Sequence, residues 1–199
     1  ERDKRQAAAR IRASRIWNAA PAAADDHPYL IKKGIKANRA RRHIQRLLLP
    51  VHNFAGDLTS LQFIEPDGSK LLLAGGCKRG SFIPATDSAG NAGLVIVCEG
   101  WATGCTLAES KPGAVVLSAI DAGNLEVVAV AARHRWPSAK LIIAGDDDRL
   151  TAGNPGATKA RAAAIAASAL FALPLWPSDA PENLTDFNDL AIWLEKGSS

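Results

Sequence analysis

The sequence predicts an α/β fold in which a parallel sheet is flanked by helices, preceded by a basic helical arm and a small antiparallel β region. In the second half of the chain, short apolar runs alternate with stretches of helical periodicity, and turn residues follow most of the runs. Strands that alternate with helices form parallel sheets with right-handed crossovers. The expected strands are residues 94–98, 114–120, 141–144 and 171–176, and the expected helices are residues 102–109, 125–136, 157–170 and 184–196.

The basic helical arm is residues 1–46, which hold 13 of the 24 Lys and Arg residues but only four of the 20 Asp and Glu residues. Residues 1–20 are rich in Ala and Arg and predict an amphipathic helix that ends at Pro21. A basic arm ahead of an acidic remainder suits the binding of a polyanion such as nucleic acid. A solvated basic helix would give the same pattern, so charge alone leaves both interpretations open.

The small antiparallel β region is residues 47–92, and the α/β domain is residues 93–199. Within the β region, three short apolar runs are separated by turns, one of which contains the Asp-Gly pair that is typical of hairpins. We therefore expect a meander of three strands. These strands are residues 47–54, 58–65 and 70–76.

Composition favours a cytoplasmic protein in a reducing compartment. No run approaches the roughly 20 apolar residues of a membrane span, and no signal peptide is recognisable, so no membrane partner is expected. The absence of any Met suggests a piece of a longer chain. The three cysteines lack a C-x-x-C pair, which argues against disulfides and against zinc in this segment. The four histidines are scattered, so we expect surface or packing roles.

Acidic residues follow two of the predicted strands. Glu99 comes directly after residues 94–98, and Asp146, Asp147 and Asp148 follow residues 141–144. Alternate residues of an extended segment point the same way, so Asp146 and Asp148 can share one site while Asp147 faces elsewhere. Paired carboxylates suit Mg²⁺ or Mn²⁺. A solvated acidic turn would also fit the aspartates.

If the two strands are neighbours, Glu99 converges with Asp146 and Asp148 at one sheet edge, where open parallel sheets place their chemistry. A further acidic group, Asp186 or Asp189, could join from the loop after the last strand. Such clusters hold one or two cations that stabilise the attacking and leaving oxygens of a phosphoryl displacement.

Two other nucleotide-binding patterns are rejected. The segment from Gly153 to Lys159 superficially suggests a phosphate loop, but that loop needs Gly directly before the Lys and Ser or Thr after it, whereas Thr158 precedes Lys159 and Ala160 follows. No G-x-G-x-x-G follows the first strand of the α/β domain, so a dinucleotide site is not predicted.

The chain from about residue 93 to residue 194 resembles the Toprim domain of DnaG-type primases, topoisomerases and some nucleases. The likeness rests on a strand ending in Glu99-Gly100, a spacing of about 45 residues, and a strand ending in Asp146-x-Asp148. The segment Asp186-Phe187-Asn188-Asp189-Leu190 agrees with it. The first half is similar to the segment that precedes Toprim in primases of phages and conjugative plasmids, on residues 27–35, 49–51, 61–70 and 121–125.

The resemblance implies the catalytic core of a DNA primase, a nucleotidyltransferase that makes RNA primers on single-stranded DNA. It implies Glu99, Asp146 and Asp148 as catalytic residues, with the same three and Asp186 as ligands of Mg²⁺ or Mn²⁺. Cellular bacterial primases carry another acid shortly after the glutamate, where this chain has Thr103, so the number of metals stays open. The implied partners are the template strand, nucleoside triphosphates and a replicative helicase.

Basic residues of the first 80 positions are expected to bind the nucleic acid. They are Lys32, Lys33, Arg39, Arg41, Arg42, Lys78 and Arg79. Two alternatives use the same residues: a Toprim nuclease that cleaves phosphodiesters, and a non-catalytic Toprim module that only binds nucleic acid. A topoisomerase is disfavoured because the single tyrosine, Tyr29, sits beside a proline in the arm.

Overall fold

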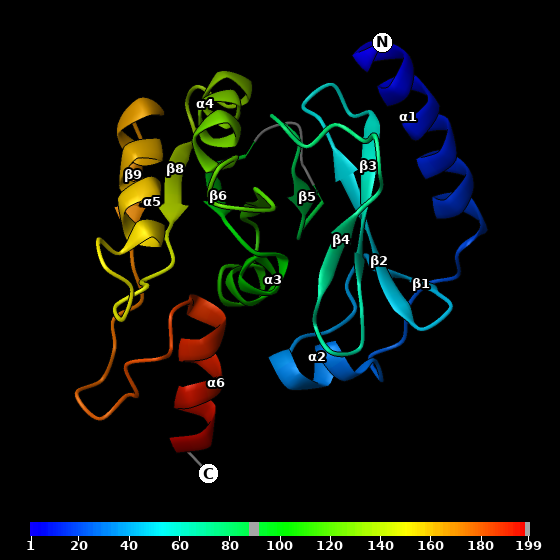
Figure 1. Ribbon diagram of the computed structural model, residues 1–199. Helices are drawn as coiled ribbons and strands as arrows, with labels where there is room; N and C mark the ends of the chain where they lie inside the picture. Colours follow the sequence, from blue (N-terminus) through cyan, green and yellow to red (C-terminus); the bar gives the residue numbers. More distant parts are fainter. Residues whose placement is uncertain (88–91, 198–199) are drawn as a thin grey trace. The chain divides into compact units, whose positions relative to one another are not determined.

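The computed structural model describes residues 1–87 and 92–197 (Figure 1). The chain divides into two compact units, Glu1–Ile83 and Pro84–Ser199. The basic arm and the antiparallel strands therefore belong to the same unit. Within the described residues, no helix is both long and apolar enough to cross a membrane.

The first unit is a four-stranded antiparallel sheet with two helices (Figure 1). The predicted first helix and the three-stranded meander are present, and one further strand, β1, precedes the meander and lies at the sheet edge. Sequence reasoning missed β1 because it has only three residues, all of them basic side chains without apolar alternation. The elements are α1 (Arg2–Ala19), α2 (Pro28–Lys33), β1 (Arg41–His43), β2 (Arg46–His52), β3 (Leu58–Ile64) and β4 (Lys70–Leu72), and the sheet order is β1-β2-β3-β4.

Helix α1 packs on this sheet through small side chains. Ala9 and Ala13 are buried in the helix, and Ala13 joins Leu48, Leu61 and Phe63 in one apolar cluster. Alanine brings the helix close to the strands, while its arginines stay exposed and Arg10 forms an ion pair with Asp57 of the turn between β2 and β3. Ala20 then adopts extended backbone angles, as expected for a residue that precedes proline, and the helix ends.

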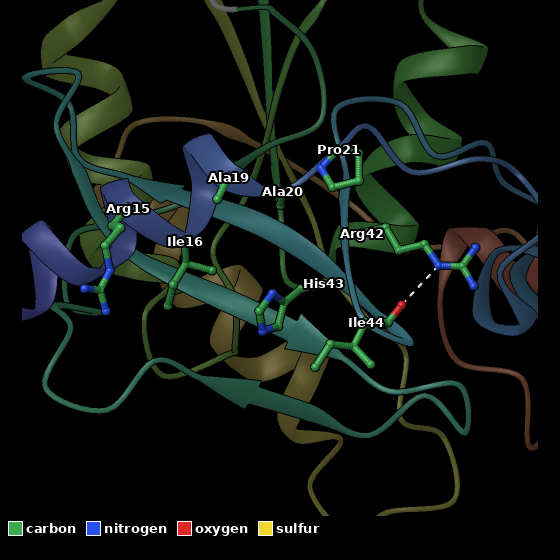
Figure 2. Close-up of a pocket in the computed structure, with 8 residues that line it drawn as sticks. All are labelled: Arg15, Ile16, Ala19, Ala20, Pro21, Arg42, His43 and Ile44. Atoms are coloured by element: carbon green, nitrogen blue, oxygen red, sulfur yellow. Dashed lines mark hydrogen bonds between the residues drawn. The ribbon is translucent and has the colours of Figure 1, made fainter.

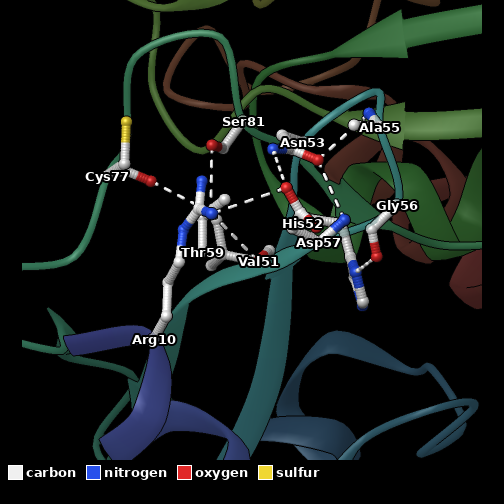
Figure 3. Close-up of polar contacts among 10 residues, drawn as sticks. All are labelled: Arg10, Val51, His52, Asn53, Ala55, Gly56, Asp57, Thr59, Cys77 and Ser81. Carbon is white, nitrogen blue, oxygen red and sulfur yellow. Dashed lines mark hydrogen bonds and ion pairs between the residues drawn. The ribbon is translucent and has the colours of Figure 1, made fainter. Parts of the chain in front are cut away.

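The turn between β2 and β3 and the loop after β4 are tied together by polar contacts (Figure 3). The Thr59 hydroxyl, which is buried, lies within 3.1 Å of the carbonyl oxygens of Val51 and Cys77. The Asn53 side chain accepts from the backbone N–H groups of Ala55 and Asp57 and so fixes the turn. These contacts hold the loop that carries Lys78 and Arg79.

The second unit is a five-stranded sheet in the order β5-β7-β6-β8-β9, with helices between the parallel strands (Figure 1). The α/β fold predicted from the sequence is confirmed. Helix α4 packs beside α5, and α3 packs beside α6. The elements are β5 (Ile83–Pro84), β6 (Leu94–Cys98), α3 (Trp101–Ser110), β7 (Val115–Ser118), α4 (Leu125–Arg135), β8 (Lys140–Ala144), α5 (Pro155–Ala166), β9 (Leu170–Ala172) and α6 (Phe187–Gly197).

Several element boundaries differ from the sequence expectation. Helix α5 ends at Ala166 rather than at residue 170, because Ser168 takes a left-handed backbone conformation (φ 49°) and turns the chain into β9. Strand β9 is Leu170–Ala172 rather than residues 171–176, since only these three residues pair with β8. Helix α6 begins at Phe187 rather than at residue 184. The Ala-rich sequence does not mark the end of α5.

Candidate active site

The carboxylates follow neighbouring strands. Strands β6 and β8 pair in parallel with Cys98 opposite Ala144, so Glu99 and Gly145 leave the sheet side by side. The condition on which the convergence of Glu99, Asp146 and Asp148 depended, that their strands are neighbours, is therefore met. Strand β7 pairs with the other edge of β6, which brings the turn at residues 121–124 to the same end of the sheet.

Asp146 has a carboxylate oxygen that is buried at the end of β8. Its Oδ1 atom is buried without a hydrogen-bond partner among the described residues. Burial, followed by the charges of Glu99, Asp186 and Asp148, raises the pKa of Asp146 to about 8. The side chain therefore sits where a positive charge would be strongly stabilised.

Asp148 is held by the first turn of α5. Its Oδ2 atom accepts a hydrogen bond from the Gly156 N–H at 2.9 Å, and its own N–H donates to the side chain of Asn154 at 2.8 Å. Asn154 also caps the helix by accepting from the Ala157 N–H. A Cβ on Gly156 would lie 2.7 Å from the Asp146 carbonyl oxygen, so only glycine allows this approach.

The segment rejected as a phosphate loop thus serves to position Asp148. Sequence reasoning missed this role of Asn154 and Gly156. The available signal was Asn154 followed by Pro155, which is the pattern of an N-cap with proline at the first helical position.

Asp147 has hydrogen-bond partners that differ from those of Asp148. Its two carboxylate oxygens accept hydrogen bonds from the Asn154 amide at 2.7 Å and from the Trp176 indole at 2.9 Å. The Asp147 N–H donates to the Thr185 carbonyl. Asp147 therefore links the loop before α5 to the segment that follows β9, and it is not one of the proposed metal ligands.

Glu99 lies between Asp148 and the turn after β7. Burial, followed by the charges of Asp148 and Asp121, raises the pKa of Glu99. A hydrogen bond from the Ala122 N–H and the charge of Lys159 act in the opposite direction. Lys159, one turn into α5, is therefore a cation close enough to act on Glu99, although sequence analysis had considered it only as part of a rejected phosphate loop.

Asp186 caps helix α6 and docks it onto α3. Its Oδ1 atom accepts from the Asp189 N–H at 2.8 Å, and its Oδ2 atom accepts from the Thr103 hydroxyl at 3.1 Å. Both Asp186 and Asp189 contribute to the raised pKa of Asp146. Asn188 is buried and donates to Thr106 at 2.9 Å, so it is turned toward α3.

The fit of a divalent cation can be judged from the donors. Over residues 1–87 and 92–197, no three His, Cys, Asp or Glu side chains are arranged to hold a metal ion by themselves. Mg²⁺, however, is usually bound by one or two carboxylates together with water and substrate phosphates. The Asp146 oxygen that lacks a hydrogen-bond partner and the nearby Asp148 carboxylate could provide these one or two carboxylate ligands. The residues fit a cation that is shared with a phosphate ligand.

The predicted nucleic-acid-binding residues all lie in the first unit. Most are exposed, but Lys33 and Arg41 are half-buried. Arg41 stacks on Trp17 at 4.5 Å and donates to the Ala20 carbonyl, so it neutralises the C-terminal end of α1. The exposed members are Lys32, Arg39, Arg42, Lys78 and Arg79.

The chain belongs to the Toprim domain family, which matches residues 94–198. It is 36% identical over 185 residues to the DNA primase TraC of Escherichia coli, a match that covers 88% of this chain and 13% of TraC. The chain thus spans about an eighth of that relative's length.

The fold is that of primase catalytic cores. The primase fragment of the bacteriophage T7 primase-helicase superposes with a TM-score of 0.61 at 13% identity, over 91% of this chain and 74% of that one. The DnaG catalytic core superposes with a TM-score of 0.54 at 13% identity, over 98% and 76%. The suspected resemblance to Toprim primases is therefore confirmed.

Proposed function

We propose that this chain is the catalytic core of a DNA primase, which transfers nucleotides to make RNA primers on single-stranded DNA. The observation that carries the proposal is the convergence of Glu99, Asp146 and Asp148 at one end of the Toprim sheet, with an unpartnered Asp146 oxygen. The relative TraC is named a DNA primase. Primase domains of bacteriophage T7 have been solved with an RNA/DNA hybrid and dTTP.

The carboxylates divide the chemistry between them. A bound Mg²⁺ or Mn²⁺ would neutralise the phosphate oxygens of the incoming nucleotide. Asp146 and Asp148 would hold that cation, Asp148 in the orientation set by Gly156. Asp186 would add negative charge near Asp146 while its hydrogen bond to Thr103 keeps α6 in place.

Glu99 is the candidate proton acceptor. The 3′-hydroxyl of one ribonucleotide attacks the α-phosphorus of the next, a new P–O bond forms, the bond to the β-phosphate breaks, and pyrophosphate leaves. The hydroxyl proton passes to Glu99, whose raised pKa brings it closer to that of an effective base near neutral pH. Lys159 is placed to bind a phosphate oxygen, because helical side chains lean toward the N-terminus of their helix.

The exposed basic residues of the first unit would hold the template backbone. Lysine and arginine bind phosphates without regard to sequence, and their contribution falls as salt rises. The T7 neighbour is part of a primase-helicase, so we also propose a replicative helicase as a partner of the longer protein.

Incorporation of labelled ribonucleotides on single-stranded DNA tests the proposal, with Mg²⁺ or Mn²⁺ present. We expect metal-dependent products from the wild-type chain and a loss of at least about 100-fold in Asp146→Asn and Asp148→Asn. Glu109→Gln, an exposed acid at the far end of α3, is the matched control and should retain activity. Metal-dependent nicking without incorporation would overturn the proposal in favour of a nuclease.

A further inference from the structure

A surface pocket of the first unit lies between the last turn of α1 and the turn that joins β1 to β2. It encloses about 470 Å³, a volume typical of small-ligand sites. Figure 2 shows its walls, which are aliphatic except for two arginines and a histidine. The lining residues are Arg15, Ile16, Ala19, Ala20, Pro21, Arg42, His43 and Ile44.

Ile44 forms one wall at a cost in stability. His43 pairs with Arg46, so Ile44 is the first residue of a two-residue hairpin turn, and its φ is 60°. That conformation normally selects glycine and is an outlier for a β-branched side chain. The Ile44 side chain is nevertheless 81% exposed, so the protein keeps a strained apolar group in water. Strain of this kind accumulates at ligand-binding positions.

The two arginines give the pocket its charge. Arg15 is exposed and forms no ion pair with any residue that the structure describes. Arg42 donates from Nε to the Ile44 carbonyl at 3.2 Å, as Figure 2 shows, and its Nη1 lies 3.6 Å from Asp26. Arg42 therefore holds the turn at the rim of the pocket, and Figure 2 shows its guanidinium directed away from Ile16 and Ala19.

We propose that this pocket receives an unpaired base of single-stranded DNA, with Arg15 and Arg42 on the flanking phosphates. An apolar cavity beside two guanidinium groups is complementary to a nucleobase on an anionic backbone. Only a single strand can turn a base out of its stack without breaking pairs, which selects against duplex DNA. The inference deepens the proposed function, because the strand would be the primase template.

Fluorescence anisotropy in EDTA tests the pocket, using labelled oligo-dT and an abasic oligonucleotide of equal length. The wild-type chain should bind oligo-dT about fivefold more tightly, since only that strand offers bases to an apolar cavity. Ile44→Gly should abolish this preference. The same change should raise the melting temperature because it removes the strained φ, so unfolding cannot explain the loss. A preference that persists in Ile44→Gly would overturn the proposal.

Arg15→Gln tests the phosphate contact. We expect it to weaken binding of both oligonucleotides about threefold. The slope of the logarithm of the binding constant against the logarithm of the salt concentration should also fall by about one, which corresponds to one counterion fewer released. Lys4→Gln removes the same charge from an exposed position at the other end of α1 and is the matched control. Equal effects of the two variants would contradict a specific role for Arg15.

The base-binding pocket and the catalytic function can be tested independently of each other. These binding measurements contain no divalent metal, so they do not depend on the carboxylates of the second unit. Oligo-dT preference with no primer synthesis would support the pocket and reject the catalytic proposal. Primer synthesis with an unchanged preference in Ile44→Gly would do the reverse.

Discussion

The Thr103 hydroxyl donates a 3.1 Å hydrogen bond to the carboxylate of Asp186, across the contact between α3 and α6. The resemblance to cellular bacterial primases implies an acidic residue at the position where this chain has Thr103. Here the position supplies a donor, so one charge fewer enters the acidic cluster and the remaining carboxylate is fixed in orientation.

Thr103→Val should therefore weaken divalent-metal binding several-fold and lower the free energy of unfolding by about 1 kcal/mol, the usual effect of losing a buried hydrogen bond. Thr106→Val is the matched control, because Thr106 lies one turn along α3 and accepts from Asn188 instead. It should cost similar stability but leave metal affinity unchanged. Mn²⁺ titration and urea unfolding of both variants separate the two effects.

Lys159→Gln should raise the KM for nucleoside triphosphate about fivefold with a smaller effect on kcat, because a charge-assisted phosphate contact is lost. Lys159→Arg should restore much of the affinity. Lys140→Gln serves as control, since Lys140 is exposed at the opposite end of β8. Steady-state kinetics of the three variants decide the matter, and an unchanged KM in Lys159→Gln would exclude the contact.

Gly156→Ala should disrupt the site without removing any polar group. The new Cβ would lie 2.7 Å from the Asp146 carbonyl oxygen and 2.8 Å from Oδ2 of Asp148, so the start of α5 must shift. We expect a loss of about 1–3 kcal/mol in stability, as for other overpacked positions, together with weakened metal binding. In Gly93→Ala the added Cβ meets nothing within 4 Å, and both properties should stay at wild-type values.

The raised pKa of Asp146 predicts a pH dependence of metal-free stability. Its folded-state pKa of about 8 lies above the ordinary aspartate value of 3.8, so the folded state binds more protons than the unfolded state between these pH values. Stability from this group is fully present below about pH 4 and is lost as pH rises toward 8. Glu99 acts in the same direction.

Urea midpoints of metal-free protein between pH 5 and pH 8 measure this dependence. The wild-type midpoint should fall with rising pH more steeply than that of Asp146→Asn, which has no proton to lose. Added Mg²⁺ should oppose the fall, because a cation replaces the proton. Identical slopes for the two proteins would show that Asp146 titrates normally.

Much of the site was predictable because strand periodicity and strand-end position are local features. The apolar runs before Glu99 and Asp146 were correctly identified as parallel strands. These expectations depend on the two-residue repeat of strands and on the order of parallel strands, both of which the sequence pattern carries.

Features that depend on tertiary contacts were not predictable. The closeness of Gly156 to two aspartates comes from how α5 meets β8, and no local pattern records it. The positive charge of Arg41 was the only reason to expect that it binds nucleic acid. In the structure its guanidinium stacks on Trp17 and donates a hydrogen bond to the Ala20 carbonyl at the end of α1. Ile44 adopts a positive φ that normally selects glycine. Residue preferences therefore gave no reason to expect a hairpin turn at this isoleucine.

The most direct test of the account is calorimetric titration of Mn²⁺ into the wild-type chain and into the Asp146→Asn/Asp148→Asn double variant, with and without a nucleoside triphosphate. The account predicts binding in the wild type that strengthens with the nucleotide, and its loss in the double variant. Equal binding by both proteins, or none by either, would contradict a metal-dependent site at this end of the sheet.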